Sequence, residues 1–195
     1  DPDSELFRMW YSTHALQLRT AHLCHATSKD GYHWERPSYD IVPGTNIVLG
    51  QEAYTHGPSI IHDPADADES RRFKLLMRPG NRQGIMGYCS PDGVHWRMVQ
   101  DEPLIPLNSD CHIGFYRDSR TGLYQASFRA ACPDRRVWRS ESDDFLHWRR
   151  PLLCLEPDVG DSPQTQIYGL QMSPYGNYVM GWISMYNTRE DDLGW

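Results

Sequence analysis

The sequence predicts an all-β protein, a β-propeller of four-stranded antiparallel blades, and three observations support this prediction. The motif S-x-D-x-x-H-W occurs three times, at Ser28–Trp34, Ser90–Trp96 and Ser142–Trp148. Each copy follows an apolar run that is itself preceded by an Asp-, Pro- or Gly-containing turn. The 195 residues include 15 Gly, 14 Pro and 12% aromatic residues, a composition that favours short strands joined by tight turns over long helices.

Each repeat is expected to form, in order, a strand, a turn, a second strand, a loop, a third strand, the motif turn and a fourth strand. The first strands of three repeats are expected at Pro58–Ile61, Ile113–Tyr116 and Ile167–Met172. The second strands are expected at Phe7–Tyr11, Phe73–Met77, Leu123–Phe128 and Asn177–Trp182. We therefore predict a single partial propeller domain, 1–195, with blade pieces at approximately 1–51, 52–107, 108–157 and 158–195. Two complete blades are flanked by two partial ones, so we expect a missing chain portion or self-association to close the ring.

The repeated motif is expected to be structural. Its Ser and Asp side chains are suited to accept hydrogen bonds from backbone N–H groups of a turn, and the Gly of two copies permits a positive φ. Its Trp is expected to pack against the neighbouring blade. The motif resembles the sialidase Asp-box, with the Trp one residue earlier, and it argues for a propeller without indicating a chemistry.

Charge and cysteine content exclude several classes of protein. The net charge is -7 without a Lys/Arg run, which argues against nucleic-acid and anionic-membrane partners. No stretch approaches the roughly 20 apolar residues of a membrane-spanning helix. The five cysteines form no C-x-x-C pair, so we expect no metal site, no cofactor and no disulfide framework, and the compartment, secreted or cytoplasmic, stays open. The acidic segment Asp63–Glu69 is interpreted as a solvated turn, with a calcium loop as the alternative.

Candidate functional residues lie in the segments that enter the innermost strands, because those strands line the channel of a propeller. These segments carry polar and aromatic groups that suit the hydroxyls and apolar face of a sugar. The candidates for binding substrate are Tyr54, His56, His112, Gln166 and Tyr168.

A resemblance to a known family makes this expectation more specific. Gly57–Pro64, Arg72–Met77, Ser90–Trp96 and Arg139–Trp148 resemble bacterial proteins described as glycoside hydrolase family 32-like, near the five-bladed furanosidase propellers of families 32, 43 and 68. The resemblance implies three carboxylates on successive inner strands, which act as nucleophile or base, orienting Asp and general acid.

The match to these catalytic motifs is partial. The inner strand of the first blade, which would carry the nucleophile, is absent from this sequence. His56-Gly57-Pro58 stands where the family has Arg-Asp-Pro, so Gly replaces the orienting Asp. Asp110-Cys111 stands where the family has Glu-Cys, which makes Asp110 the candidate catalytic acid or transition-state stabiliser; a turn cap is its other interpretation.

Three functions therefore remain open. The first is a glycoside hydrolase that acts on a furanoside or a polysaccharide in the central funnel. The second is a non-catalytic carbohydrate-binding propeller, in which the altered motifs reflect lost catalysis. The third is a protein-interaction propeller, which an exposed apolar patch of several hundred Å² would favour.

Overall fold

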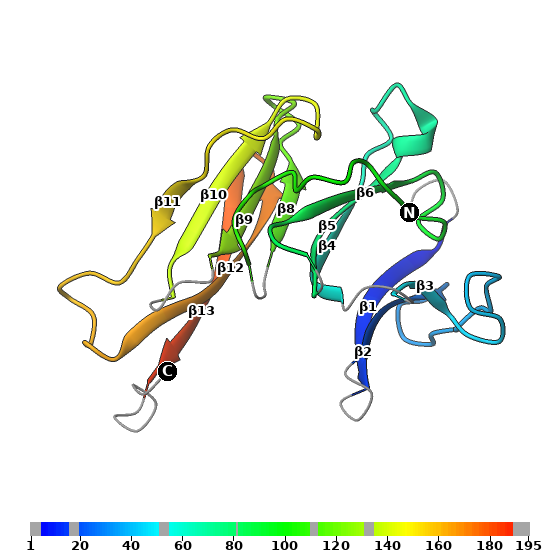
Figure 1. Ribbon diagram of the computed structural model, residues 1–195, viewed down its shortest axis with the longest axis horizontal. Coiled ribbons are helices and arrows are strands. Elements are labelled where there is room, and N and C mark those ends of the chain that lie inside the picture. Colours follow the sequence, from blue (N-terminus) through cyan, green and yellow to red (C-terminus); the bar gives the residue numbers. More distant parts are fainter. Residues whose placement is uncertain are drawn as a thin grey trace. The chain divides into compact units, whose positions relative to one another are not determined.

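The computed structural model describes residues 5–15, 20–50, 55–80, 82–109, 113–130 and 135–188. The chain divides into two compact units: the first comprises Asp1–Arg82 and Gly87–Asp101, and the second comprises Gln83–Met86 and Glu102–Trp195. In the described part of the chain, the elements are antiparallel strands and one short 3-10 helix, η1 (Glu69–Arg71) (Figure 1).

The first unit holds two sheets. One has the order β1-β2-β3, and the other has the order β4-β5-β6-β7, so each strand pairs with its neighbour in the chain. The strands of the first sheet are β1 (Phe7–Ala15), β2 (Thr20–Ser28) and β3 (Ile47–Leu49). The strands of the second sheet are β4 (Thr55–His62), β5 (Phe73–Pro79), β6 (Met86–Ser90) and β7 (Arg97–Met98).

The second unit repeats this arrangement. Its four-stranded sheet has the order β11-β10-β9-β8, and β12 pairs with β13 in a two-stranded sheet that packs against β8 and β9 (Figure 1). The strands of the larger sheet are β8 (Gly114–Arg117), β9 (Tyr124–Arg129), β10 (Val137–Ser142) and β11 (Leu152–Leu155). The strands of the smaller sheet are β12 (Thr165–Tyr175) and β13 (Tyr178–Asn187).

These meanders confirm the predicted all-β fold of antiparallel propeller blades. In the described part of the chain, two sheets have four strands, one has three, and one has two, which is consistent with complete and partial blades. The blade boundaries at 51, 107 and 157 and the single-domain assignment stay predictions.

Each motif copy forms the same hydrogen-bonded turn, and the second copy shows its geometry. The Ser90 hydroxyl accepts from the backbone N–H groups of Asp92 (3.3 Å) and Gly93 (2.8 Å). One carboxylate oxygen of Asp92 accepts from the backbone N–H of His95 at 2.8 Å, while the other contacts its Nδ1 at 2.7 Å. The Trp96 indole donates to the carbonyl oxygen of Gly93 at 3.1 Å. The Asp–His and indole contacts recur in the other copies, at Asp30, His33 and Trp34 and at Asp144, His147 and Trp148.

In the third motif copy, the observed ring contacts of the Trp lie within its own blade, and its packing against a neighbouring blade stays a prediction. The Trp148 ring lies 6.2 Å from Phe115 and 6.4 Å from Phe145, both within its own blade. Trp10 of β1 links two blades of the first unit, since its indole donates to the Gly93 carbonyl oxygen at 2.7 Å. The hydrogen bond that the motif Trp makes within its own turn holds the ring over its own sheet.

Most of the acidic segment Asp63–Glu69 is exposed, as expected of a solvated turn, but Asp63 is buried and the Asp66 side chain is only 12% exposed. Lys74 is fully buried, and its ammonium contacts Asp63 at 2.7 Å and Asp66 at 2.8 Å. Asp63 is only 3% exposed, and the Arg71 side chain also contacts Asp66, at 3.2 Å. A buried charge is stable only when it is paired, so this network fixes the β4–β5 turn. The lysine ammonium lies between the two carboxylates, where the alternative interpretation would put a calcium ion.

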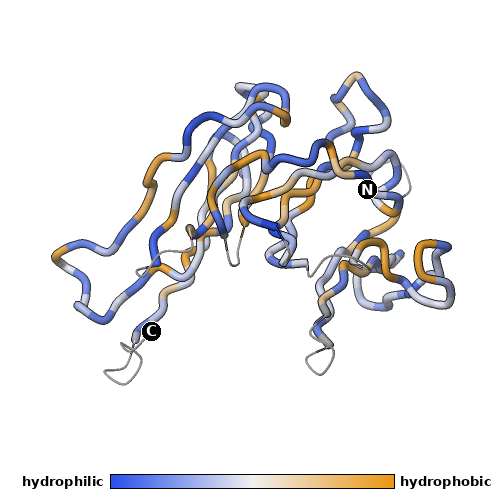
Figure 2. The backbone as a smooth tube through the Cα atoms, viewed as in Figure 1, coloured by the Kyte–Doolittle hydropathy of each residue, from blue (hydrophilic) through white to orange (hydrophobic). Residues whose placement is uncertain are grey.

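The sheets differ sharply in burial. All five residues of β6 are buried, and Leu75, Leu76 and Met77 of β5 are fully buried. In β13, by contrast, Trp182 is 57% exposed and Ile183 is 50% exposed. Figure 2 shows a second apolar segment at a sheet edge, in β11, where Leu152 is 57% exposed. Within the described residues, the second edge of β13 pairs with no strand.

Candidate functional site

The candidate site lies in the second unit, where the end of β9, the start of β10 and the start of β12 converge. Arg129, the last residue of β9, pairs with Val137 at the start of β10. The backbone N–H of Ile167 in β12 donates to the carbonyl oxygen of Arg135 at 3.1 Å. These backbone contacts bring together side chains that are far apart in the sequence.

A β-bulge in β12 positions one of the aromatic side chains. Gln166 pairs with Tyr186 of β13 and Ile167 with Met185, but the next pair is Gly169 with Ser184, which leaves Tyr168 as the extra residue. A bulge of this kind changes the direction of a side chain relative to the regular alternation of a strand. The Tyr168 and Tyr186 rings lie with their centroids 5.8 Å apart.

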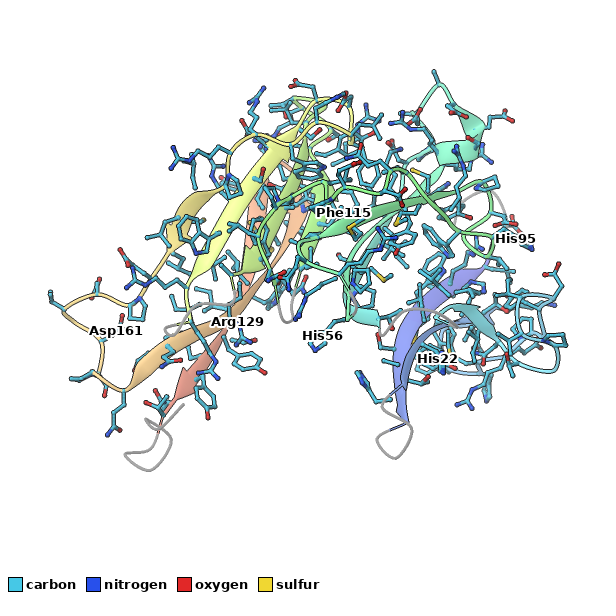
Figure 3. The ribbon with its side chains drawn as sticks, viewed as in Figure 1. His22, His56, His95, Phe115, Arg129 and Asp161 are labelled. Atoms are coloured by element: carbon cyan, nitrogen blue, oxygen red, sulfur yellow. The ribbon has the colours of Figure 1, made fainter. Side chains whose placement is uncertain are left out.

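Two arginines pack against this tyrosine pair. The guanidinium carbon of Arg129 lies 4.3 Å from the Tyr168 ring centroid, and that of Arg135 lies 4.7 Å from the Tyr186 ring centroid. Arg129 is 3% exposed, and Figure 3 shows it at the end of β9 beside β12. Arg135 also donates from Nη1 to the Gln166 side-chain oxygen at 2.6 Å. Cation–π contacts and this hydrogen bond hold the five side chains as one cluster, which we call the Arg/Tyr cluster.

The next residue in the chain, Arg136, has a different environment. Its guanidinium contacts the Glu156 carboxylate at 2.8 Å, and its side chain is 41% exposed. Successive residues of an extended segment point to opposite faces, so Arg135 belongs to the cluster while Arg136 lies on the outside of the sheet. The pair offers a natural comparison, since both carry the same charge.

In the first unit, the predicted residue His56 lies in another β-bulge. His56 pairs with Arg78 of β5, and the next pair is Ser59 with Leu76. Gly57, inside the bulge, has a φ of 58°. Glycine adopts this left-handed conformation without the steric cost that a side chain adds. The backbone conformation therefore gives a reason for glycine at the position where the resembled family has its orienting Asp.

The structure brings together only part of the predicted site. Gln166 and Tyr168 lie in the Arg/Tyr cluster, whereas His56 belongs to the other unit. Tyr54, Asp110 and His112 lie outside the described residues, although Ser109, just before Asp110, forms a β-bridge with Ala130. Sequence reasoning missed Arg129, Arg135 and Tyr186. For Arg129 a signal existed, because a charged residue directly follows the apolar run Leu123–Phe128.

In the described part of the chain, no group of three or more His, Cys, Asp or Glu side chains is placed to hold a metal ion. The same residues contain no helix long and apolar enough to cross a membrane. The contacts of the Arg/Tyr cluster offer hydrogen bonding, stacking and positive charge. These are the interactions with which proteins orient polar ligands such as sugars.

Comparison with known proteins places the fold among propeller glycoside hydrolases. The β-fructofuranosidase of Bombyx mori, a GH32 protein, matches with a TM-score of 0.66 and 14% identity over 94% of this chain and 39% of its own. The fructofuranosidase of Schwanniomyces occidentalis matches with a TM-score of 0.64 and 15% identity over 95% of this chain and 38% of its own. The exo-β-1,3-galactanase of Phanerochaete chrysosporium matches with a TM-score of 0.53 and 13% identity over 87% of this chain and 37% of its own.

These matches confirm the predicted resemblance in fold to the propeller glycoside hydrolases. The chain spans less than two fifths of the length of the three hydrolases, as their coverage of 39%, 38% and 37% shows. No protein-family model and no curated protein matches the sequence.

Proposed function

We propose that this chain forms part of a glycoside hydrolase-like propeller that binds a glycan where its innermost strands begin. The observation that carries the proposal is the Arg/Tyr cluster at the start of β12, in which Tyr168 and Tyr186 lie beside the polar groups of Arg135 and Gln166. Aromatic rings beside a few convergent polar groups are typical of small-ligand sites. The solved structures of similar fold support a carbohydrate over other ligands, because they are hydrolases of fructosides and galactans by name.

Hydrolysis is the proposed reaction, and Asp110 is the proposed acid or transition-state stabiliser. Glycoside hydrolysis needs two carboxyl groups on opposite sides of the scissile bond. Asp110 follows Ser109 in the sequence, and Ser109 forms a β-bridge with Ala130, the residue after the end of β9 at Arg129. A furanoside or a polysaccharide side chain is the proposed substrate, in a ring of the five-bladed type. The alternative is a propeller of the same fold that binds the glycan without cleaving it.

The test is a screen of aryl furanosides, aryl pyranosides and plant polysaccharides for released sugar, with Asp110→Asn as the matched variant. Hydrolysis that falls at least about 100-fold in Asp110→Asn supports the proposal. Hydrolysis that is unchanged in the variant excludes Asp110 as the acid. Binding of a glycan, measured by calorimetry, without release of sugar by the wild-type chain favours the non-catalytic alternative.

We also propose that two copies of the chain associate through the open edge of β13. This strand of ten residues carries no charged side chain, and its apolar residues are exposed on both faces. An uncharged edge strand pairs with its own copy without like-charge repulsion. Light scattering is expected to show a dimer that Ile183→Lys dissociates, while Val159→Lys, in the fully exposed loop before β12, leaves it intact. A monomer at all concentrations, or a further protein chain bound in its place, overturns the proposal.

A further inference from the structure

Arg135 differs from three other arginines of the second unit in the groups that contact its guanidinium. Arg136, Arg120 and Arg149 each contact a carboxylate, of Glu156, Asp118 and Glu141 respectively. Among the described residues, Arg135 contacts no carboxylate: its neighbours are the Gln166 amide and the Tyr168 and Tyr186 rings. Its positive charge is therefore held by neutral groups.

The described residues do not satisfy every donor of this guanidinium. A guanidinium has five N–H groups in one plane. The Tyr186 ring covers a face of that plane at 4.7 Å, and Nη1 donates to Gln166 at 2.6 Å. The Nε atom is buried and has no hydrogen-bond partner in the described part of the structure. A buried donor without a partner is costly, so this nitrogen is expected to bind a group that the described residues do not supply.

The chemistry of that group follows from the fork of donors. Two parallel N–H groups of a guanidinium match the two oxygens of a carboxylate, and the charge strengthens both hydrogen bonds. Gln166 and Tyr186 hold the guanidinium in one orientation, which lowers the entropy lost on binding. The buried Arg129, stacked on Tyr168 at 4.3 Å, adds a second positive charge nearby.

We infer that the Arg/Tyr cluster binds an acidic sugar, a hexuronate whose carboxylate pairs with Arg135. The inference rests on the proposed glycan-binding function and names its substrate class. Gln166 acts as a positioning residue for the guanidinium, and the two tyrosines border the bound sugar ring. A neutral hexose offers no anion to this charge, so it binds more weakly in the same place.

The test compares matched acidic and neutral sugars on the full chain. The probes are the methyl glycosides of glucuronate and glucose and those of galacturonate and galactose, titrated by NMR or calorimetry. For one of the two pairs, the wild-type chain is expected to bind the acidic sugar at least about tenfold more tightly, as charge-assisted hydrogen bonds require. Arg135→Gln removes this preference and leaves the weak binding of the neutral sugar.

Arg136→Gln is the matched control, because it removes the same charge one residue further along. The acidic preference is expected to survive in Arg136→Gln and to survive in part in Arg135→Lys, which keeps the charge but loses the fork. Equal loss in Arg135→Gln and Arg136→Gln overturns the inference, since it indicates non-specific attraction. Equal affinity for acidic and neutral sugars overturns the inference alone. No binding of either sugar in a pair overturns both the inference and the proposed glycan function. Circular dichroism of each variant establishes that it is folded.

Discussion

The second and third copies of the repeated motif have the same left-handed backbone at one position, where one copy has glycine and the other has phenylalanine. Gly93 has a φ of 77° and Phe145 has a φ of 71°, at the same position of the same turn. A Cβ at Gly93 would lie 2.6 Å from the Trp10 side chain. The second motif copy therefore needs glycine at this position for space as well as for conformation. Phe145 is fully buried, and its ring lies 5.7 Å from Phe115 and 5.8 Å from Tyr124.

This comparison distinguishes the effect of the hydrogen bonds within the turn from the effect of the residues that pack against it. The Ser, Asp, His and Trp contacts are alike in both copies, so the hydrogen bonds of the turn do not decide which residue follows the Asp. At Gly93 the adjacent β1 approaches closely, and Trp10 and Arg8 donate to the turn. At Phe145 the turn covers its own sheet, and the buried ring compensates for the cost of the left-handed backbone.

The largest effect is expected at Phe145. Phe145→Ala removes a buried ring and keeps a side chain at positive φ, so it should lower the free energy of unfolding by about 3–5 kcal/mol. Phe145→Gly removes the same ring but relieves the backbone, so it should be about 1 kcal/mol less destabilising than the alanine variant. Urea unfolding of both variants measures this order. A glycine variant less stable than the alanine variant would contradict the strained backbone at this position.

Gly93→Ala is expected to cost about 3 kcal/mol, from the strained φ and the collision with Trp10 together. Gly31→Ala is the matched control in the first motif copy. Gly31 has a φ of 78°, but a Cβ there would come no closer than 3.8 Å to Phe7. Its expected cost is about 1 kcal/mol, that of the conformation alone. Equal destabilisation of the two variants by urea would mean that the contact with Trp10 is unimportant.

Acid should weaken the contact of the second motif copy with β1 before it affects the third copy. Burial and the nearby Arg8 lower the pKa of His25 to about 4, although Asp92 partly opposes this. The Nε2 atom of His25 accepts from Arg8 at 3.2 Å and Nδ1 contacts the Tyr39 hydroxyl at 2.5 Å, so an added proton would face a cation. Because an unfolded histidine has a pKa of about 6.5, the stabilisation is complete above that pH and is lost as the pH falls toward 4.

The expected loss is about 2 kcal/mol between pH 7.5 and pH 5. Hydrogen exchange locates it: the amides of β1 and β2 should lose protection in this range, while those of β9 and β10 keep theirs. The motif carboxylates act at lower pH, because hydrogen bonds from His147 and the turn keep the pKa of Asp144 at about 2 despite partial burial. Equal loss of protection in both regions above pH 5 would contradict the role of His25.

The smallest expected effect is a change in the pKa of one motif histidine, His95. His95 contacts Asp92 at 2.7 Å through Nδ1 and Asp40 at 3.1 Å through Nε2, and both hydrogen bonds raise its pKa. Asp40→Asn should lower the pKa of His95 in an NMR titration, because it removes one of the two carboxylates that contact the ring. An unchanged His95 titration would show that the contact with Asp40 is absent in solution.

How far the site could be predicted follows from particular residues. Gln166 and Tyr168 were chosen as candidates because they lie where the apolar strand expected at Ile167–Met172 begins, which is a local pattern. Arg135 and Tyr186 could not be found in this way, because their role depends on a strand pairing and a bulge between residues distant in sequence. Arg129 is recognisable in the sequence as a charged residue that follows an apolar run. Only the structure shows that its guanidinium packs against the Tyr168 ring.

The sequence by itself determined the blade pattern, because turn residues and strand periodicity act over a few neighbouring residues. It also determined the motif turn, whose hydrogen bonds join Asp92 to residues only two or three positions away. Only the tertiary structure decided that Lys74 is buried between two carboxylates, that Gly93 lies against Trp10, and that Arg135 lies beside Tyr186. These contacts join strands that are far apart along the chain, and their energies depend on burial and distance, which arise only when the sheets pack.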